Sequence, residues 1–252
     1  MTVHFADIDA VTFDFYNTLV YHRQGDGRGA MLMEYLAIQG LASDPWEHQV
    51  LYDVFEHHGK DYSPNLPAEE KRRYLVRLAK QVFQRLNVRA PDGAAADHAA
   101  NVWSVLGPAS LGVFPDVSNV LKLLRGAGYR LAVVSNWQCG LRHFCTELGF
   151  GDALDHVVAS AEVGCAKPNP EIFRDVCRRV GIPCRRVLHV GDSVVDDIEG
   201  AHGAGMQAVL VRRDDGVPSV GAPTITKLDR LPDMLGLNGA VSGPSEGPLT
   251  GA

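Results

Sequence analysis

The segment Ala10–Val20, with the sequence AVTFDFYNTLV, constrains the fold of this chain more than any other stretch. Apolar residues from Val11 to Phe15 surround a single carboxylate, Asp14, and the pair Asn17-Thr18 marks a turn after them. A nearly continuous apolar run is typical of a parallel strand that is covered on both faces. Parallel sheets bind ligands at the carboxyl ends of their strands, so we expect Asp14 to lie at such a site. A carboxylate in that position is costly unless other groups compensate its charge.

The second half of the chain alternates between strand-like and helix-like segments. Predicted strands are Arg130–Ser135, Val157–Ser160, Arg186–Val190, Ala208–Val211 and Thr224–Leu228. Predicted helices are Val117–Arg125, Cys139–Leu148, a helix that opens at Pro168-Asn169-Pro170 and ends at Val180, Asp196–Gly205 and Leu231–Leu235. This alternation predicts an α/β fold with a doubly wound, largely parallel sheet.

Between these strands and Asp14 lies a long stretch with helical periodicity only. We expect four helices there: Ala30–Leu41, Pro45–His58, Ala68–Leu86 and Asp92–Leu106. The stretch is far longer than the connection of a parallel α/β unit, so it indicates an inserted domain. We expect a core domain of residues 1–20 and 109–237 and a helical domain of residues 21–108. The helical domain would start with a flexible connection at Tyr21–Arg28, and residues 238–252 would be a disordered tail.

Composition narrows the classes of partner and location. The formal charge is −6 and there is no basic block, which argues against nucleic acid or an anionic membrane as the main partner. No stretch approaches the ~20 apolar residues of a membrane span. The chain has five cysteines without a C-x-x-C pair, which we interpret as reduced thiols of a cytoplasmic protein. Asp7 and Asp9 stand where a signal peptide needs apolar residues.

Polar side chains end three strands of the predicted sheet. These ends are Phe13-Asp14, Val134-Ser135-Asn136 and Val190-Gly191-Asp192. A fourth polar residue, Lys167, comes just before the helix start at Pro168. Because the carboxyl ends of parallel strands meet at one edge of the sheet, we expect all of these side chains to gather there.

This set of residues predicts a particular chemistry. Asp14 and Asp192 would be two carboxylates in one cleft, and they repel each other unless a cation bridges them. Oxygen ligands alone favour Mg²⁺, and Lys167 adds a positive charge that keeps Asp14 ionised. Neutral donors for an anionic group are Thr18, Ser135 and Asn136. A carboxylate nucleophile beside Mg²⁺ and a lysine suits phosphoryl transfer through an aspartyl-phosphate.

The order of these motifs is similar to that of the haloacid dehalogenase-like (HAD) hydrolase superfamily. The matching motifs are D-x-x-x-T-L at Asp14–Leu19, V-S-N at Val134–Asn136, K-P at Lys167-Pro168 and G-D-S-x-x-x-D at Gly191–Asp197. The resemblance implies a Rossmann-like core with a helical cap inserted after the first motif. It implies that Asp14 is nucleophile and metal ligand, that Asp192 is a metal ligand, that Asp197 supports the metal site and that the backbone carbonyl of Tyr16 is a further ligand. Phosphate contacts by Thr18 and Ser135 and charge balance by Lys167 are implied as well.

Tyr16 departs from the pattern of the superfamily's phosphatases. Those enzymes usually carry an aspartate, the general acid/base, two residues after the nucleophile. A tyrosine there resembles the 2-haloacid dehalogenase branch, which uses the same nucleophile on carbon without a metal but usually lacks the intact G-D-S-x-x-x-D motif. A phenol, with a free pKa of about 10, is a poor base at neutral pH but can donate a proton.

Three functions are therefore open. The first is a Mg²⁺-dependent phosphatase of a small phosphomonoester, the second a metal-independent 2-haloacid dehalogenase, and the third a non-catalytic protein that binds a phosphorylated ligand. The substrate and the oligomeric state do not follow from the sequence, because the predicted helical domain carries no recognisable ligand motif.

Overall fold

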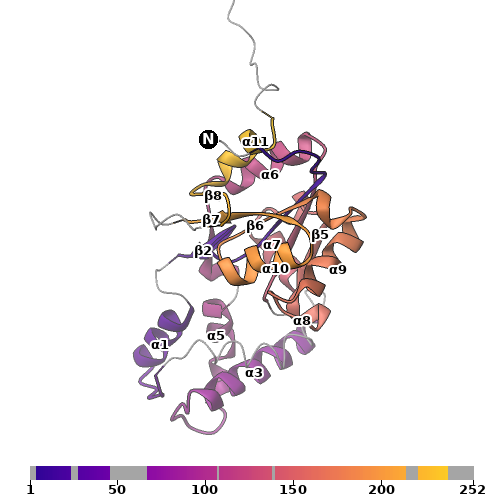
Figure 1. Cartoon of the computed structure of the whole chain (residues 1–252). Coiled ribbons are helices and arrows are strands. Elements are labelled where there is room, and N and C mark those ends of the chain that lie inside the picture. Colours follow the sequence, from indigo (N-terminus) through magenta and orange to yellow (C-terminus); the bar gives the residue numbers. More distant parts are fainter. Residues whose placement is uncertain are drawn as a thin grey trace, which may run out of the picture.

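The computed structural model describes residues 4–23, 28–45, 67–106, 108–137, 140–213 and 221–237. Its centre is a parallel sheet of six strands in the order β5-β4-β1-β6-β7-β8 (Figure 1). The strands are β1 (Ala10–Phe13), β4 (Arg130–Ser135), β5 (His156–Ala159), β6 (Val187–Gly191), β7 (Gln207–Val211) and β8 (Thr224–Ile225). All neighbouring pairs are parallel, which confirms the predicted α/β fold with a doubly wound sheet.

The order of the strands reverses at β1. From β1 the sheet extends to β4 and β5 on one side, and the chain then returns to build β6, β7 and β8 on the other side. Ligands of open α/β sheets bind where the strand order reverses in this way, outside the carboxyl ends of the strands. The ends of β1, β4 and β6 are therefore adjacent, as the motifs predicted.

Helices cover both faces of the sheet. One face packs against α6 (Val117–Gly126), α7 (Leu141–Glu147) and α11 (Leu231–Met234), and the other against α9 (Pro170–Val180) and α10 (Gly200–Gly203). Successive strand residues point to opposite faces, so Val11 and Phe13 pack in the first core and Ala10 in the second. This two-sided burial explains why the strands are apolar almost without alternation.

A separate group of helices lies between β2 and β3 in the chain (Figure 1). It comprises α1 (Arg28–Ile38), α3 (Ala68–Arg85), α4 (Ala94–Asp97) and α5 (Ala99–Leu106), whose buried side chains form a cluster of their own. Trp103 of α5 also contacts Phe144 of the sheet domain, with ring centroids 6.1 Å apart. The predicted helix at 45–58 and the predicted tail at 238–252 lie outside the described residues.

A two-stranded antiparallel ribbon was not predicted. It pairs β2 (Val20–His22) with β3 (Leu111–Val113), so the prediction of a flexible connection from Tyr21 onward is wrong at its start. The ring of Tyr21 lies over Gly112, where a Cβ would come within 2.5 Å of it. Strands of three residues are too short to produce a recognisable alternation, and this pairing depends on a residue ninety positions away.

Several element boundaries also differ from the predictions. The segment predicted as one helix at Asp92–Leu106 breaks at His98, and the helix predicted at Asp196–Gly205 is a π-helix (Val194–Glu199) followed by α10. Further short elements are α8 (Ser160–Val163) and the 3-10 turns Pro108–Ser110, Gly151–Ala153, Cys184–Arg186 and Leu228–Arg230. Among the described helices, none has the length and apolar character needed to cross a bilayer.

Arg213, two residues after β7, forms an ion pair at the start of α6 and a hydrogen bond to the turn that follows β1. Arg213 donates to Asp116 (2.7 Å) and to the backbone carbonyl of Thr18 (2.5 Å), and its guanidinium lies 4.0 Å from the centre of the Phe114 ring. The carboxylate of Asp116 also accepts the backbone N–H of Leu228 at 2.6 Å. Both charged side chains are nearly buried, so either one left alone would be a desolvated charge.

We therefore predict that Asp116→Ala lowers the free energy of unfolding by about 3 kcal/mol, because it leaves Arg213 unpaired. Asp116→Asn keeps an acceptor for Leu228 and should cost less. Urea denaturation measures both, with the exposed Asp92→Ala as the control that stays within ~0.5 kcal/mol of the parent protein. An Asp116→Ala protein as stable as this control would contradict the structural role of the pair.

Candidate active site

Asp14 lies directly after β1 and is held from both neighbouring strands. Its backbone N–H donates to the carbonyl of Val190 in β6 (2.8 Å), and its Oδ1 accepts from the hydroxyl of Ser135 at the end of β4 (2.9 Å). Only 5% of Asp14 is exposed. The structure therefore brings together the ends of the three strands that the sequence singled out.

Lys167 bridges two carboxylates in this buried space. Its Nζ lies 2.6 Å from Oδ1 of Asp14 and 2.5 Å from Oδ1 of Asp197, and its side chain is only 3% exposed. Asn136 fixes the backbone of the lysine, because its amide oxygen accepts the Lys167 N–H (2.7 Å) and its amide nitrogen donates to the Lys167 carbonyl (3.0 Å). The side chain of Asn136 thus orients the lysine, and its predicted phosphate contact stays a prediction.

The charges in this group are unequally compensated. Burial, the largest effect, raises the pKa of Asp14, and the nearby Asp197 adds to this, while Lys167 opposes it only in part. Burial also works against the charge of Lys167 and Asp197. In Lys167, the two carboxylates outweigh it and raise the pKa above its usual value. In Asp197, Lys167 and His189 outweigh it and hold the pKa below the usual range.

The π-helix sets the position of Asp197. Its first turn includes a bond from the N–H of Ile198 to the carbonyl of Ser193, five residues earlier, at 3.2 Å. Oδ2 of Asp197 accepts the backbone N–H of Ser193 at 2.9 Å, and its Oδ1 lies 3.0 Å from Nε2 of His189. The carboxylate rests on Gly191, where a Cβ would come within 2.2 Å of its Cγ. Both oxygens of Asp197 are therefore engaged within the protein.

Asp192 is the least compensated carboxylate of the group. Burial, together with the charges of Asp14 and Asp197, raises its pKa to about 7, although Lys167 and a hydrogen bond from the side chain of Asn17 lower it. Asn17 adopts the left-handed conformation (φ 60°) in the turn after Asp14. This turn carries Asn17 to the carboxylate at the end of β6.

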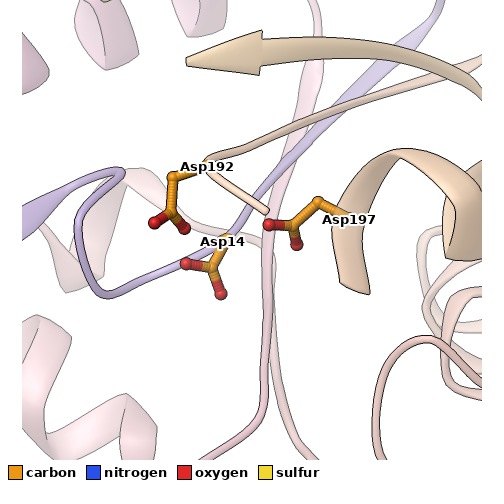
Figure 2. Close-up of side chains that lie close together, drawn as sticks. All are labelled: Asp14, Asp192 and Asp197. Carbon is orange, nitrogen blue, oxygen red and sulfur yellow. The ribbon is translucent and has the colours of Figure 1, made fainter. Parts of the chain in front are cut away.

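The three carboxylates offer oxygen ligands of the kind that a hard divalent cation prefers. Asp14, Asp192 and Asp197 each offer an oxygen, and these atoms lie within 4.8 Å of one another. Figure 2 shows the three side chains converging from the end of β1, the end of β6 and the π-helix. Lys167 balances only one of the three charges, and the donors are all oxygen. The residues therefore fit Mg²⁺, with Asp14 and Asp192 as the carboxylates that are not fully engaged elsewhere.

Thr18 and Tyr16 occupy the turn beside these carboxylates. Thr18 is fully buried, and its Oγ1 has no hydrogen-bond partner in the described part of the chain. Such an atom is costly unless a ligand completes it, which agrees with the predicted phosphate contact. The ring of Tyr16 packs edge-on against His22 of β2, with centroids 5.7 Å apart. The metal contact of its carbonyl stays a prediction.

Sequence reasoning missed the supporting residues of this site. The sequence pattern marks Asn17 only as a turn residue and Thr12 and His189 only as members of strands, whereas Oγ1 of Thr12 lies 2.9 Å from Nδ1 of His189. Polar residues inside otherwise apolar strands were the signal that could have found the latter two, because a buried polar side chain needs a partner.

Gly191 offers a direct test of how Asp197 is held. We predict that Gly191→Ala lowers the free energy of unfolding by about 3 kcal/mol, because the new methyl group displaces the Asp197 carboxylate from Lys167. The matched control is Gly126→Ala at the end of α6, where a Cβ meets nothing within 4 Å, and there we expect no loss of stability. Equal effects of both changes in urea denaturation would contradict the close packing of Asp197 on Gly191.

Comparison with known proteins agrees with this geometry. The chain is 35% identical over 132 residues to the mouse haloacid dehalogenase-like hydrolase domain-containing protein 3, of which it spans about half the length (49%). It is 29% identical over 212 residues to a glyceraldehyde 3-phosphate phosphatase of Methanopyrus kandleri, covering 78% of this chain and 82% of that protein.

The fold has a counterpart among solved structures. An HAD phosphatase from Thermococcus onnurineus matches with a TM-score of 0.60 and 23% identity, over 91% of this chain and 98% of that one. At this identity the likeness concerns the fold alone. The family model described as haloacid dehalogenase-like hydrolase matches residues 8–205, which include every residue of the site. The chain therefore belongs to the haloacid dehalogenase-like hydrolase family.

Proposed function

We propose that this protein is a Mg²⁺-dependent phosphatase that hydrolyses a small phosphomonoester through an aspartyl-phosphate. The observation that carries the proposal is the group of the buried Asp14 and Lys167 with the half-buried Asp192 at one edge of the sheet. A carboxylate between two strand ends, touched by a lysine and faced by a second carboxylate, suits the binding of a cation together with an anionic phosphoryl group. The phosphatase names of relatives such as that of Methanopyrus kandleri support the same reaction.

Asp14 is the nucleophile in this proposal. A carboxylate oxygen of Asp14 forms a bond to phosphorus while the bond from phosphorus to the leaving oxygen breaks. Lys167 and Ser135, which both donate to Oδ1 of Asp14, hold the carboxylate in place, and the hydroxyl of Thr18 donates to a phosphate oxygen. Water then attacks phosphorus, breaks the Asp14–phosphorus bond and releases inorganic phosphate.

Proton transfer to the leaving oxygen is assigned to Tyr16. It stands two residues after the nucleophile, and its phenol can donate a proton although it is a weak base. Asp14 and Asp192, with the Tyr16 carbonyl, would hold Mg²⁺, which would supply positive charge beside the phosphoryl oxygens. Asp197 supports this site through Lys167 rather than by a free oxygen of its own.

We further propose that the helical segment between β2 and β3 is a cap domain over the sheet domain. We place the core at residues 1–20 and 109–237 and the cap at 21–108, although the β2–β3 ribbon joins both sides of this boundary. The separate buried cluster of α1, α3 and α5 supports this division. A cytoplasmic location is part of the same proposal and rests on the composition of the sequence alone.

A 2-haloacid dehalogenase is the second candidate, and Tyr16 is the observation that favours it. In that reaction Asp14 would attack carbon rather than phosphorus and would need no metal. The poorly compensated charge of Asp192 argues against it, since a metal-free site gains nothing from a further carboxylate beside Asp14 and Asp197. A non-catalytic binder of a phosphorylated ligand would use the same residues without turnover.

One set of assays separates the three candidates. Purified protein is incubated with a panel of phosphorylated metabolites and 2-haloacids, each with Mg²⁺ and with EDTA, and the release of phosphate and of halide is measured. We expect phosphate release that EDTA abolishes. Halide release in EDTA would establish the dehalogenase instead, and binding of phosphorylated compounds without any release would establish the binder.

Removal of the nucleophile provides the matched test. Asp14→Asn should lower phosphate release by at least about 10⁴-fold, because an amide cannot form the covalent intermediate. Asp196→Asn, which changes an acid in the same region but outside the carboxylate group, should stay within ~3-fold of the parent protein. Activity that survives in Asp14→Asn would exclude Asp14 as the nucleophile.

The raised pKa of Asp192 predicts how metal binding depends on pH. Below its pKa of about 7 this carboxyl group is protonated in the metal-free protein, so a cation must displace a proton to bind. The apparent Kd for Mg²⁺ should therefore rise about tenfold per unit as the pH falls below 7 and should be nearly constant above 7. Calorimetric titration measures this, with Asp196→Asn as the control that keeps the dependence. The measurements span about pH 5.5 to about pH 8, on both sides of the pKa. A Kd of the parent protein that is constant over this range would contradict the predicted pH dependence.

A further inference from the structure

A chain of hydrogen bonds connects the carboxylate group of the site with two buried residues of the sheet. Lys167 contacts Oδ1 of Asp197, the same oxygen lies 3.0 Å from Nε2 of His189, and Nδ1 of His189 lies 2.9 Å from Oγ1 of Thr12. The mechanism proposed above uses neither His189 nor Thr12. We propose that these two residues are positioning residues, which hold Asp197 turned toward Lys167 and so hold Lys167 against the nucleophile.

The sheet itself brings the two residues together. Thr12 of β1 and His189 of β6 are directly paired in the parallel register, and neither side chain is exposed. They lie on the face that α9 covers, where every neighbouring strand residue is apolar. Phe173 of α9 packs edge-on against the imidazole, with ring centroids 5.0 Å apart. A polar pair in such a place is costly unless both members are hydrogen-bonded, and here they bond to each other and to Asp197.

The chemistry of the partners fixes the direction of these bonds. Lys167 and His189 hold Asp197 ionised, so its oxygens only accept, and Nε2 of His189 must carry the proton that it shares with Oδ1. Thr12 then anchors the other ring nitrogen, which prevents the imidazole from flipping. In metal sites, partners that orient a ligand in this way commonly change activity 10- to 100-fold when they are removed.

The loss of His189 would affect the nucleophile indirectly, through Asp197 and then Lys167. Asp197 would keep only Lys167 and the N–H of Ser193 as donors, so its carboxylate could rotate and the ammonium group of Lys167 would follow it away from Asp14. The described bonds of His189 and Thr12 are to each other and to Asp197, and not to Asp14. We therefore expect a fall in kcat with little change in KM, and this expectation rests on the proposed hydrolase function.

The kinetic test compares two replacements of the histidine. His189→Phe keeps the ring but removes the donor, and we expect it to lower kcat 10- to 100-fold with KM within ~3-fold. His189→Gln offers a donor at the position of Nε2 and should stay within ~5-fold. The control for a purely structural effect is Leu124→Ala, a buried change in α6 at a residue without contact to the carboxylate group. Its kcat per folded molecule, with the folded fraction taken from near-UV circular dichroism, should be unchanged.

Thr12 provides an independent arm of the same test. Thr12→Ser keeps the hydroxyl and should behave as the parent protein, whereas Thr12→Val has nearly the same shape and should lower kcat several-fold. Equal losses in His189→Phe and His189→Gln, or equal activity of Thr12→Ser and Thr12→Val, would overturn the proposal.

A spectroscopic readout separates this inference from the assignment of function. Long-range ¹H–¹⁵N spectra of the histidine rings report which nitrogen carries a proton, and the signals of His189 are identified by their absence from His189→Gln. We expect Nε2 of His189 to be protonated and the spectrum to change in Thr12→Val but not in Thr12→Ser. An unprotonated Nε2 would overturn the proposal even if the enzyme is an active phosphatase. A protein without any hydrolase activity but with this spectrum would instead refute only the proposed function.

Discussion

The contact of Lys167 with Asp14 and Asp197 is the interaction on which the rest of the site depends. It is buried, so its three charges are expensive to desolvate and must be held in good geometry to be tolerated at all. The fold supplies this geometry from four separate segments, namely the ends of β1 and β4, the loop before α9 and the π-helix. The bonds of Asn136 to the Lys167 backbone and the absence of a side chain at Gly191 serve the same arrangement. The sheet thus positions a nucleophile whose charge is only partly compensated.

The remaining charge explains why the site suits a metal. Lys167 contacts Asp14 and Asp197 directly, but Asp192 faces both of them with only a hydrogen bond from Asn17 and the more distant lysine in compensation. Its raised pKa is the sign of that imbalance. A divalent cation at this position would restore the balance for Asp192 and would supply the positive charge that an anionic substrate requires.

Much of this arrangement was predictable from the sequence, and the exceptions share a physical cause. The strand that ends at Asp14, the parallel sheet and the gathering of Ser135, Lys167 and Asp192 at one edge follow from local periodicity and from the topology of α/β folds. The β2–β3 ribbon could not be predicted, because strands of three residues are too short to show an alternation of apolar and polar residues. The Thr12–His189 pair could not either, since its two residues are distant in the chain, and the π-helix at Asp197 shows the same helical periodicity that predicted an α-helix there.

The central claim is that Asp14 is the group that carries the phosphoryl moiety. Rapid acid quenching during turnover of a phosphorylated substrate, followed by tryptic digestion and mass spectrometry, tests it most directly, because the fragment from residue 1 to Arg23 contains Asp14. Our account predicts one phosphoryl group on this fragment, located to Asp14 by fragmentation and absent from Asp14→Asn. Release of phosphate with no modification of Asp14, or with the phosphoryl group on another residue, would contradict it.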